Sequence, residues 1–142
     1  MNLNALEPEM FEAVERVARF METLDDTALE GVFAETDVTI IENFAPHIFS
    51  GADAVQAWAR GFRKHAEGLS GLKHAFGTPQ DFSAQGGLAF FTLPTIWTGT
   101  GNGAAFSEQG GWAFVLIRQN GRWRIKGYGW AVTSVSREYA AS

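Results

Sequence analysis

The residue in this sequence best placed for chemistry is Glu42, an acid within an otherwise apolar strand pattern. The segment TDVTIIENF, residues 36–44, alternates in character, and alternate residues of a strand point to the same face. One face then carries Val38, Ile40, Glu42 and Phe44. Burial among apolar neighbours disfavours a charged carboxylate, so we expect the pKa of Glu42 to rise toward the range useful for a general base. The alternative is a structural carboxylate that accepts hydrogen bonds from a backbone amide, an arginine or a tryptophan N–H.

The three histidines offer less specific signals. His47 could approach Glu42 if the chain turns back after Pro46, which would give an acid/base pair with an imidazole oriented by a carboxylate. The alternative is a loop histidine exposed to solvent. His74 lies at the start of a strand and could face a cavity or water, and His65 lies near the inward stripe of a helix. The histidines form no close ligand pair and the chain has no cysteine, so no metal site is expected, and no cofactor is implied.

Aromatic residues make up 13% of the chain, with five Trp and twelve Phe. Trp58 and Phe62 are one helical turn apart, and Trp97, Trp112 and Trp130 lie on successive strands. These five residues, with His74, are predicted to line a pocket that binds a small apolar or aromatic molecule by stacking and area burial. Packing in an ordinary core is the alternative for each of them.

Other features exclude several classes of function. The net charge is −5 and Lys and Arg are scattered, which disfavours a nucleic-acid partner. No apolar stretch reaches membrane-spanning length, the N-terminus is acidic where a signal peptide would be basic, and the lack of cysteine favours the cytoplasm. The glycine-rich GTGNG at residues 99–103 lies between two strands and so lacks the helix N-terminus of a phosphate site.

Helices are predicted in the first half of the chain. Apolar residues recur every three to four positions from Pro8 to Leu24, as one helix face requires. Asp25, Asp26 and Thr27 supply caps for a short second helix over residues 28–33. A third helix opens at Ser50-Gly51-Ala52-Asp53 and ends at Gly68.

Strands and turns fill the second half. Four strands are expected, at Lys73–Phe82, Leu88–Gly99, Ala104–Gln119 and Arg122–Ser134. Glycine-rich separators follow the first three of these, and Asn120-Gly121 is the strongest hairpin turn signal because both residues tolerate positive φ. The segments therefore predict a meander of antiparallel hairpins.

The last strand carries a further signal. Trp123 and Ile125 face the core, and Gly127 and Gly129 indicate a bulge beyond which facing cannot be assigned from the pattern. Without a bulge, Tyr128 and Trp130 would be exposed on the outer sheet surface and would form an interface.

Three N-terminal helices followed by long antiparallel strands predict an α+β fold, with a curved sheet wrapped around the helices. The length of 142 residues suits a single domain spanning residues 1–142.

Three stretches together resemble the nuclear transport factor 2-like superfamily, in particular its SnoaL-like and ketosteroid isomerase-like branch. They are the strand DVTIIENFAPHIFSG, the helix ADAVQAWARGF and the terminal strands GGWAFVLIRQNGRWRIKGYGWA. The resemblance implies a cone-shaped, cystatin-like roll and a homodimer through the outer sheet face. Members of this superfamily include isomerases, dehydratases, epoxide hydrolases, cyclases and proteins without catalysis, so the resemblance leaves the activity open.

In the ketosteroid isomerase branch, the general base is an Asp eight residues before a Ser-Gly pair, and the same count from Ser50 leads to Glu42. That branch also uses a helix-one Tyr and a strand Asp as an oxyanion hole. Helix one here has no Tyr, and the matching strand offers Trp112 in place of the acid. Scytalone dehydratase-like members use paired histidines, for which His47 and His74 are available here.

Two functions follow as hypotheses. One is a proton-transfer isomerase or lyase with Glu42 as base and His47 as helper; the other is a non-catalytic ligand-binding or dimerisation module of the same fold. A cavity with Glu42 at its wall favours catalysis, whereas a packed interior with Glu42 paired to an arginine favours the module.

Overall fold

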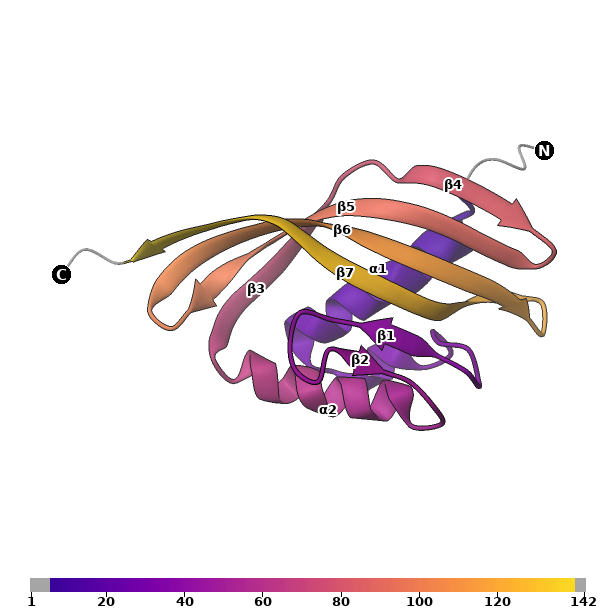
Figure 1. The fold of residues 1–142 in the computed structure, drawn as a ribbon, viewed down its shortest axis with the longest axis horizontal. Helices are drawn as coiled ribbons and strands as arrows, with labels where there is room; N and C mark the ends of the chain where they lie inside the picture. The colour runs from indigo at the N-terminus through magenta and orange to yellow at the C-terminus, as the bar shows by residue number, and fades with distance from the viewer. Residues whose placement is uncertain (1–5, 140–142) are drawn as a thin grey trace.

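The fold is known from a computed structural model that describes residues 6–139 (Figure 1). It contains two α-helices, α1 (Pro8–Thr23) and α2 (Ala54–Ala66), and a four-residue 3₁₀ helix, η1 (Asp26–Leu29). The strands are β1 (Thr39–Ile41), β2 (Ile48–Phe49), β3 (Leu69–Phe76), β4 (Gln80–Gln85), β5 (Leu88–Gly101), β6 (Ala104–Gln119) and β7 (Arg122–Tyr139). The predicted α+β fold is confirmed.

The strands form one curved, unclosed sheet. Its order is β2-β1-β7-β6-β5-β3, with β4 also paired to β5. The long strands β5, β6 and β7 arch over α1, and α2 lies on the same side of these strands, below β1 and β2 in the view (Figure 1). The pairs from β5 to β7 are antiparallel as predicted, but β1 pairs with β7 in parallel. The sheet is therefore mixed. The parallel pairing is possible because β1 and β7 are not joined by a hairpin, which would make them antiparallel.

The first helix buries the predicted apolar stripe. Pro8 lies in its first turn, where a missing N–H costs nothing, and Leu24 ends it in the left-handed conformation with its N–H bonded to the Phe20 carbonyl oxygen. The buried side chains are Met10, Ala13, Val14, Val17, Ala18, Phe20 and Met21. Within residues 6–139, no helix has both the length and the hydrophobicity needed to cross a membrane.

The predicted second helix over residues 28–33 is wrong. Asp25 does cap a helical turn, accepting from the Thr27 backbone N–H at 3.0 Å, but that turn is η1, which ends at Leu29. Residues 30–32 then form a turn with Gly31 at φ 70°, after which Phe33 forms a parallel bridge to Ile125 of β7. Pairing with the sheet satisfies this backbone better than a further helical turn would.

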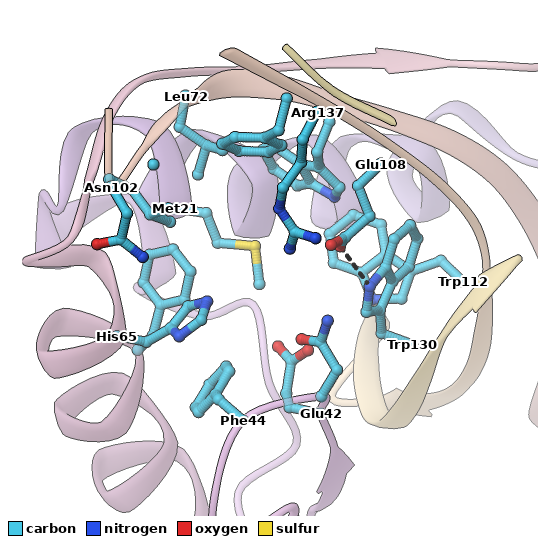
Figure 2. A pocket seen from close by; sticks show the side chains of 16 residues that line it. Met21, Glu42, Phe44, His65, Leu72, Asn102, Glu108, Trp112, Trp130 and Arg137 are labelled. Carbon is cyan, nitrogen blue, oxygen red and sulfur yellow. Dashed lines mark hydrogen bonds between the residues drawn. The ribbon is translucent and has the colours of Figure 1, made fainter. Parts of the chain in front are cut away.

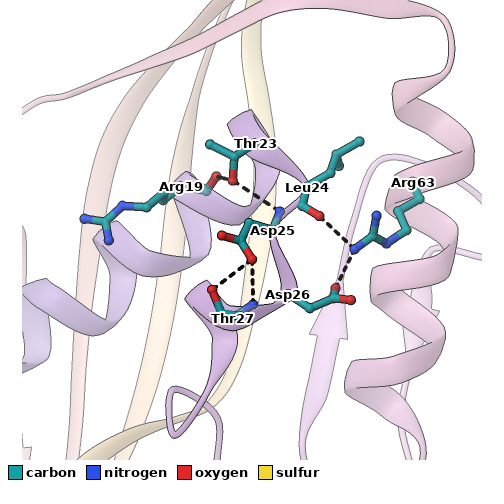
Figure 3. Close-up of polar contacts among 7 residues, drawn as sticks. All are labelled: Arg19, Thr23, Leu24, Asp25, Asp26, Thr27 and Arg63. Carbon is teal, nitrogen blue, oxygen red and sulfur yellow. Dashed lines mark hydrogen bonds and ion pairs between the residues drawn. The ribbon is translucent and has the colours of Figure 1, made fainter.

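Arg63 fixes α2 against the end of α1 (Figure 3). Its Nη2 donates to the Leu24 carbonyl oxygen at 2.8 Å and to Asp26 Oδ1 at 2.5 Å. Rings of the two helices also meet, with Phe20 lying 5.3 Å from Trp58 and 6.0 Å from Phe62 between centroids. These contacts orient the helix that carries Trp58, Phe62 and His65.

Residues 36–44 keep the predicted alternation but not the predicted strand length. Val38, Ile40, Glu42 and Phe44 are all buried. Strand pairing, however, covers only Thr39–Ile41, after which the chain turns and returns as β2. The turn contains a cis Ala45-Pro46 bond and His47 at φ 75°, neither of which can continue a strand.

The predicted hairpin turns are confirmed. Asn120 and Gly121 have φ values of 52° and 75°, and the flanking residues Gln119 and Arg122 pair directly. The loops at residues 86–87 and 102–103 also have positive φ at both residues. The strand predicted at residues 73–82 is instead two strands, β3 and β4, both paired to β5.

Two β-bulges on β7 decide which side chains face inward. Val115 pairs with Gly127 and Leu116 with Ile125, so Lys126 is an extra residue, as the glycines had indicated. Further along, Gln109 pairs with Ser134 and Gly110 with Val132, so Thr133 is a second extra residue. Each bulge reverses the alternation of the strand.

Candidate functional site

A cavity of about 320 Å³ lies between α2, the turn after β1 and the inner face of the sheet (Figure 2). Its lining is largely aromatic and aliphatic, with a few polar groups. The residues are Met21, Glu42, Asn43, Phe44, Phe62, His65, Leu69, Leu72, Trp97, Gly101, Asn102, Phe106, Glu108, Trp112, Trp130 and Arg137. Asn43, Asn102 and Arg137 are exposed, whereas Trp112 and Phe62 are buried, so the cavity runs from solvent into the core.

Glu42 lies at the wall of this cavity, with only 5% of its surface exposed. Its Oε2 accepts two hydrogen bonds, from Trp58 Nε1 at 2.9 Å and from the Tyr128 hydroxyl at 2.5 Å. Among the described residues no donor is bonded to Oε1, so this oxygen is left to interact with the contents of the cavity. The carboxyl group thus has one oxygen held by the protein and one available to a ligand.

Burial raises the pKa of Glu42 from 4.5 to about 7, because the charged form loses its hydration. The hydrogen bonds from Tyr128 and Trp58 oppose this rise, and the nearby charge of Glu108 adds to it. Burial and the Glu42 carboxylate raise the pKa of Tyr128 well above 10.0, so its hydroxyl remains a donor. A carboxyl group that titrates near neutral pH can take up or release a proton during catalysis.

Tyr128 is the contributor to this site whose facing the sequence pattern left open. Without a bulge it would lie on the outer sheet surface, but the bulge at Lys126 turns Tyr128 and Trp130 to the inner face, where both are buried. Gly127 permits this arrangement, because a Cβ there would lie 2.5 Å from the Thr39 carbonyl oxygen of β1. The glycines at 127 and 129 were the only signal in the sequence.

His47 does not reach the Glu42 carboxyl group. It is exposed in the β1–β2 turn, and its Nδ1 lies 3.1 Å from the Glu42 backbone carbonyl oxygen. The backbone N–H of Glu42 also donates to the His47 carbonyl oxygen at 2.8 Å. His47 therefore contacts the main chain of Glu42 and not its carboxyl group, and it is not among the residues that line the cavity.

His74 also lies outside the cavity lining but has a carboxylate partner of its own. Its Nδ1 lies within hydrogen-bond distance of Glu22 Oε1 of α1, and the two side chains are each about a quarter exposed. The ring packs 5.5 Å from Trp97, which does line the cavity. No local pattern indicates this pair, because 52 residues separate its members.

The predicted aromatic lining is present in part. Phe62, Trp97, Trp112 and Trp130 all line the cavity, whereas Trp58 lies behind Glu42 as its hydrogen-bond donor. Trp112 packs edge-on against Trp97, Tyr128 and Trp130, and its Nε1 is buried without a partner in the described residues. The Trp130 ring covers Gly110, and its Nε1 donates to Glu108 Oε1 at 3.2 Å.

His65 stands near the cavity entrance. Its ring stacks on Phe44 with centroids 5.1 Å apart, and desolvation of the ring lowers the pKa of His65 although the Glu108 charge opposes the change. The imidazole is therefore largely neutral at pH 7. In the part of the chain from residue 6 to 139, no group of three His, Asp or Glu side chains is arranged to hold a metal ion.

Solved structures share this architecture. The fold resembles a hexachlorocyclohexane dehydrochlorinase (LinA type 2), with a TM-score of 0.79 and 7% identity over 94% of this chain and 91% of that one. A putative scytalone dehydratase from Novosphingobium aromaticivorans has a TM-score of 0.70 and 14% identity over 94% and 90% of the two chains. A nuclear transport factor 2-like superfamily protein from Salmonella enterica has a TM-score of 0.73 and 17% identity over 89% of each chain.

These likenesses show that the chain has the nuclear transport factor 2-like fold, as its sequence predicted. No protein-family model matches the chain, and no curated protein matches it. At such low identities the likeness extends to the fold alone, so the chemistry must be argued from the cavity.

Proposed function

We propose that this protein is a small-molecule lyase or isomerase that binds an apolar or aromatic compound in its cavity and moves a proton with Glu42. The observation that carries the proposal is the Glu42 carboxyl group at the cavity wall, buried, with one oxygen held by Trp58 and Tyr128 and the other unbonded among the described residues. A general base needs this combination of access and a pKa near the working pH.

Two further points support the proposal. The hydrogen bond from Trp58 Nε1 matches the structural alternative, but Glu42 is not paired with an arginine and its Oε1 accepts no hydrogen bond among the described residues, which leaves that oxygen open to a ligand. The solved structures of similar fold include a hexachlorocyclohexane dehydrochlorinase and a putative scytalone dehydratase, both named as elimination enzymes. These names motivate the choice of a lyase or isomerase.

The proposed chemistry is proton abstraction from carbon. Glu42 Oε1 accepts the proton from a C–H bond next to an electron-withdrawing group, and the bonding electron pair moves toward that group. Expulsion of a leaving group then completes an elimination, and return of the proton to a different carbon completes an isomerisation. The apolar walls exclude water and keep the carboxylate basic.

The test is hydrogen–deuterium exchange at carbon, with the bicyclic ketone 2-tetralone as probe and NMR in D₂O as the readout. We expect the wild-type protein to accelerate exchange, with a rate that rises as pH passes through about 7. Glu42→Gln should lower the protein-dependent rate by roughly 100-fold or more. Glu12→Gln, which changes an exposed glutamate on α1, is the matched control and should keep the full rate.

The Glu22–His74 pair gives the second candidate centre, because a carboxylate-oriented imidazole can also act as a base. If His74→Gln abolishes exchange and Glu42→Gln does not, the reaction belongs to that pair. If the wild-type protein binds 2-tetralone but does not accelerate exchange, the rival hypothesis of a non-catalytic ligand-binding module is favoured.

We also propose a homodimer that forms through the outer face of the sheet. Tyr128 and Trp130 do not contribute to that face, but Ile96 of β5 and the cross-strand pair Ile41 and Ile48 are exposed there. Exposed apolar side chains on a broad sheet are typical of a self-complementary interface.

A cytoplasmic location stays a prediction.

A further inference from the structure

Arg137 is the one Lys or Arg among the cavity-lining residues. Its side chain enters the cavity from the end of β7, while Glu42 enters from the opposite side (Figure 2). The other ionisable lining groups are Glu108 and His65. The cavity therefore has a permanent positive charge near its exposed entrance and a carboxyl group of near-neutral pKa in its buried wall.

The guanidinium is available to a ligand. No carboxylate of the described residues lies within 4.0 Å of it, although Glu108 belongs to the same cavity. One oxygen of Glu108, Oε1, accepts from Trp130 Nε1 at 3.2 Å. A guanidinium carries five N–H donors in a planar fork, which matches the two oxygens of a carboxylate.

A bulge in β7 brings Arg137 to the cavity. The bulge at Thr133 reverses the alternation of β7, so that residues 135 and 137 face the same side as Trp130. Arg137 pairs across the ladder with Phe106, which also lines the cavity. Without this bulge, residues 134 and 136, both serines, would take those positions.

From this geometry, and resting on the proposed function, we infer that the substrate is an aromatic carboxylic acid. Its carboxylate binds Arg137, its ring system packs against the indoles of Trp97 and Trp112, and its acidic C–H lies toward Glu42. Repulsion between two carboxylates disfavours the reverse orientation, and attraction to Arg137 favours this one. Arg137 is thus a specificity-determining residue for the proposed reaction.

The test is isothermal titration of two probes that share one ring system: 2-naphthoate, which is an anion, and 2-acetylnaphthalene, its neutral methyl ketone. We expect wild-type protein to bind the anion roughly tenfold more tightly than the ketone. Arg137→Gln should remove that difference by weakening the anion alone. Arg60→Gln removes the same charge from the exposed face of α2 and should leave both affinities within about twofold.

Equal affinity for both probes, or an Arg137→Gln variant that retains the preference for the anion, would overturn the assignment of a carboxylate ligand while leaving the proposed proton transfer intact. Absence of binding by both probes would overturn this inference together with the cavity on which the proposed function rests. Deuterium exchange from 2-tetralone, which is neutral, tests Glu42 independently, so the two proposals can fail separately.

Discussion

The two oxygens of the Glu42 carboxyl group lie in different surroundings, and this asymmetry governs how the residue responds to pH. Oε2 is held by Trp58 and Tyr128, whereas Oε1 is unbonded within residues 6–139. Loss of hydration outweighs the two hydrogen bonds, since the pKa of the group rises to about 7. The folded protein therefore holds a proton on Glu42 at pH values where the unfolded chain has lost it.

This difference predicts the pH dependence of stability. Between pH 4.5 and about 7 the native state binds more protons at Glu42 than the unfolded state, so the free energy of unfolding falls as pH rises through this window. The Glu42 contribution lost over the window is about 3 kcal/mol. Urea unfolding of wild-type and Glu42→Gln proteins across this range isolates the effect, because Gln does not titrate.

We expect the stability of the variant relative to wild type to increase with pH by roughly that amount. Parallel pH profiles for the two proteins would show that Glu42 keeps an ordinary pKa in the folded state, and the proposed base would lose its physical support.

Sequence reasoning reached part of this site. The burial of Glu42 followed from strict alternation over residues 38–44, a local pattern that the structure preserves. Its partner Tyr128 was not found. Which β7 side chains point inward depends on a bulge, and the position of that bulge is set by pairing with β6 and β1. The Glu22–His74 pair was missed for a related reason: its members come together only through packing of α1 against β3.

At the scale of elements, β7 shows why glycine positions matter. Trp130 needs room for its ring, and Gly110 on the facing strand provides it. A Cβ at residue 110 would lie 2.4 Å from the Ala131 carbonyl oxygen and 2.6 Å from Trp130 Cη2. These distances are far below ordinary contact, and one of the obstacles is backbone, which cannot rotate away.

Gly110→Ala should therefore lower the free energy of unfolding by about 2 kcal/mol or more and displace Trp130 from Glu108. Gly111→Ala is the matched control, because the nearest atom to its added Cβ is Thr92 Cγ2 at 3.8 Å, an ordinary contact. We expect this neighbour to be neutral or slightly stabilising. Equal stability of the two variants in urea unfolding would contradict the packing described for Trp130.

The elements themselves were predicted with uneven success, for physical reasons. The helices predicted from Pro8 and from residues 50–53 and the two-residue turns follow from local periodicity and positive-φ residues, and the structure has α1 (Pro8–Thr23), α2 (Ala54–Ala66) and these turns. The helix predicted over residues 28–33 does not form, because Gly31 takes a left-handed conformation in a turn and Phe33 pairs with Ile125, which is distant in sequence. The parallel pairing of β1 with β7 likewise has no local signature.

At the scale of the whole molecule, the exposed outer sheet face predicts self-association. Light scattering after size exclusion should give twice the 15.5 kDa mass of the chain. Ile96→Lys and Ile48→Lys place a charge on that face and should each shift the mass toward the monomer. Gln56→Lys adds the same charge to exposed α2 and should not change the mass. A monomeric wild-type protein would contradict the proposed dimer.

The span of the chain as a single domain and its cytoplasmic location stay predictions from length and composition. The overall fold was predictable because local sequence patterns indicate the order of its helices and hairpins. A pocket was also predicted, but the sequence pattern could not distinguish lining aromatics from core aromatics or show that the bulges on β7 turn Trp130 and Arg137 toward the cavity.

The three indoles around the cavity have a practical consequence. Trp97, Trp112 and Trp130 are chromophores whose emission responds to the polarity of their surroundings, and they account for three of the five tryptophans in the chain. A compound that enters the cavity replaces water beside these rings and so alters the ultraviolet emission of the unlabelled protein. The molecule therefore carries its own optical reporter, with which collections of compounds can be screened before any substrate is known.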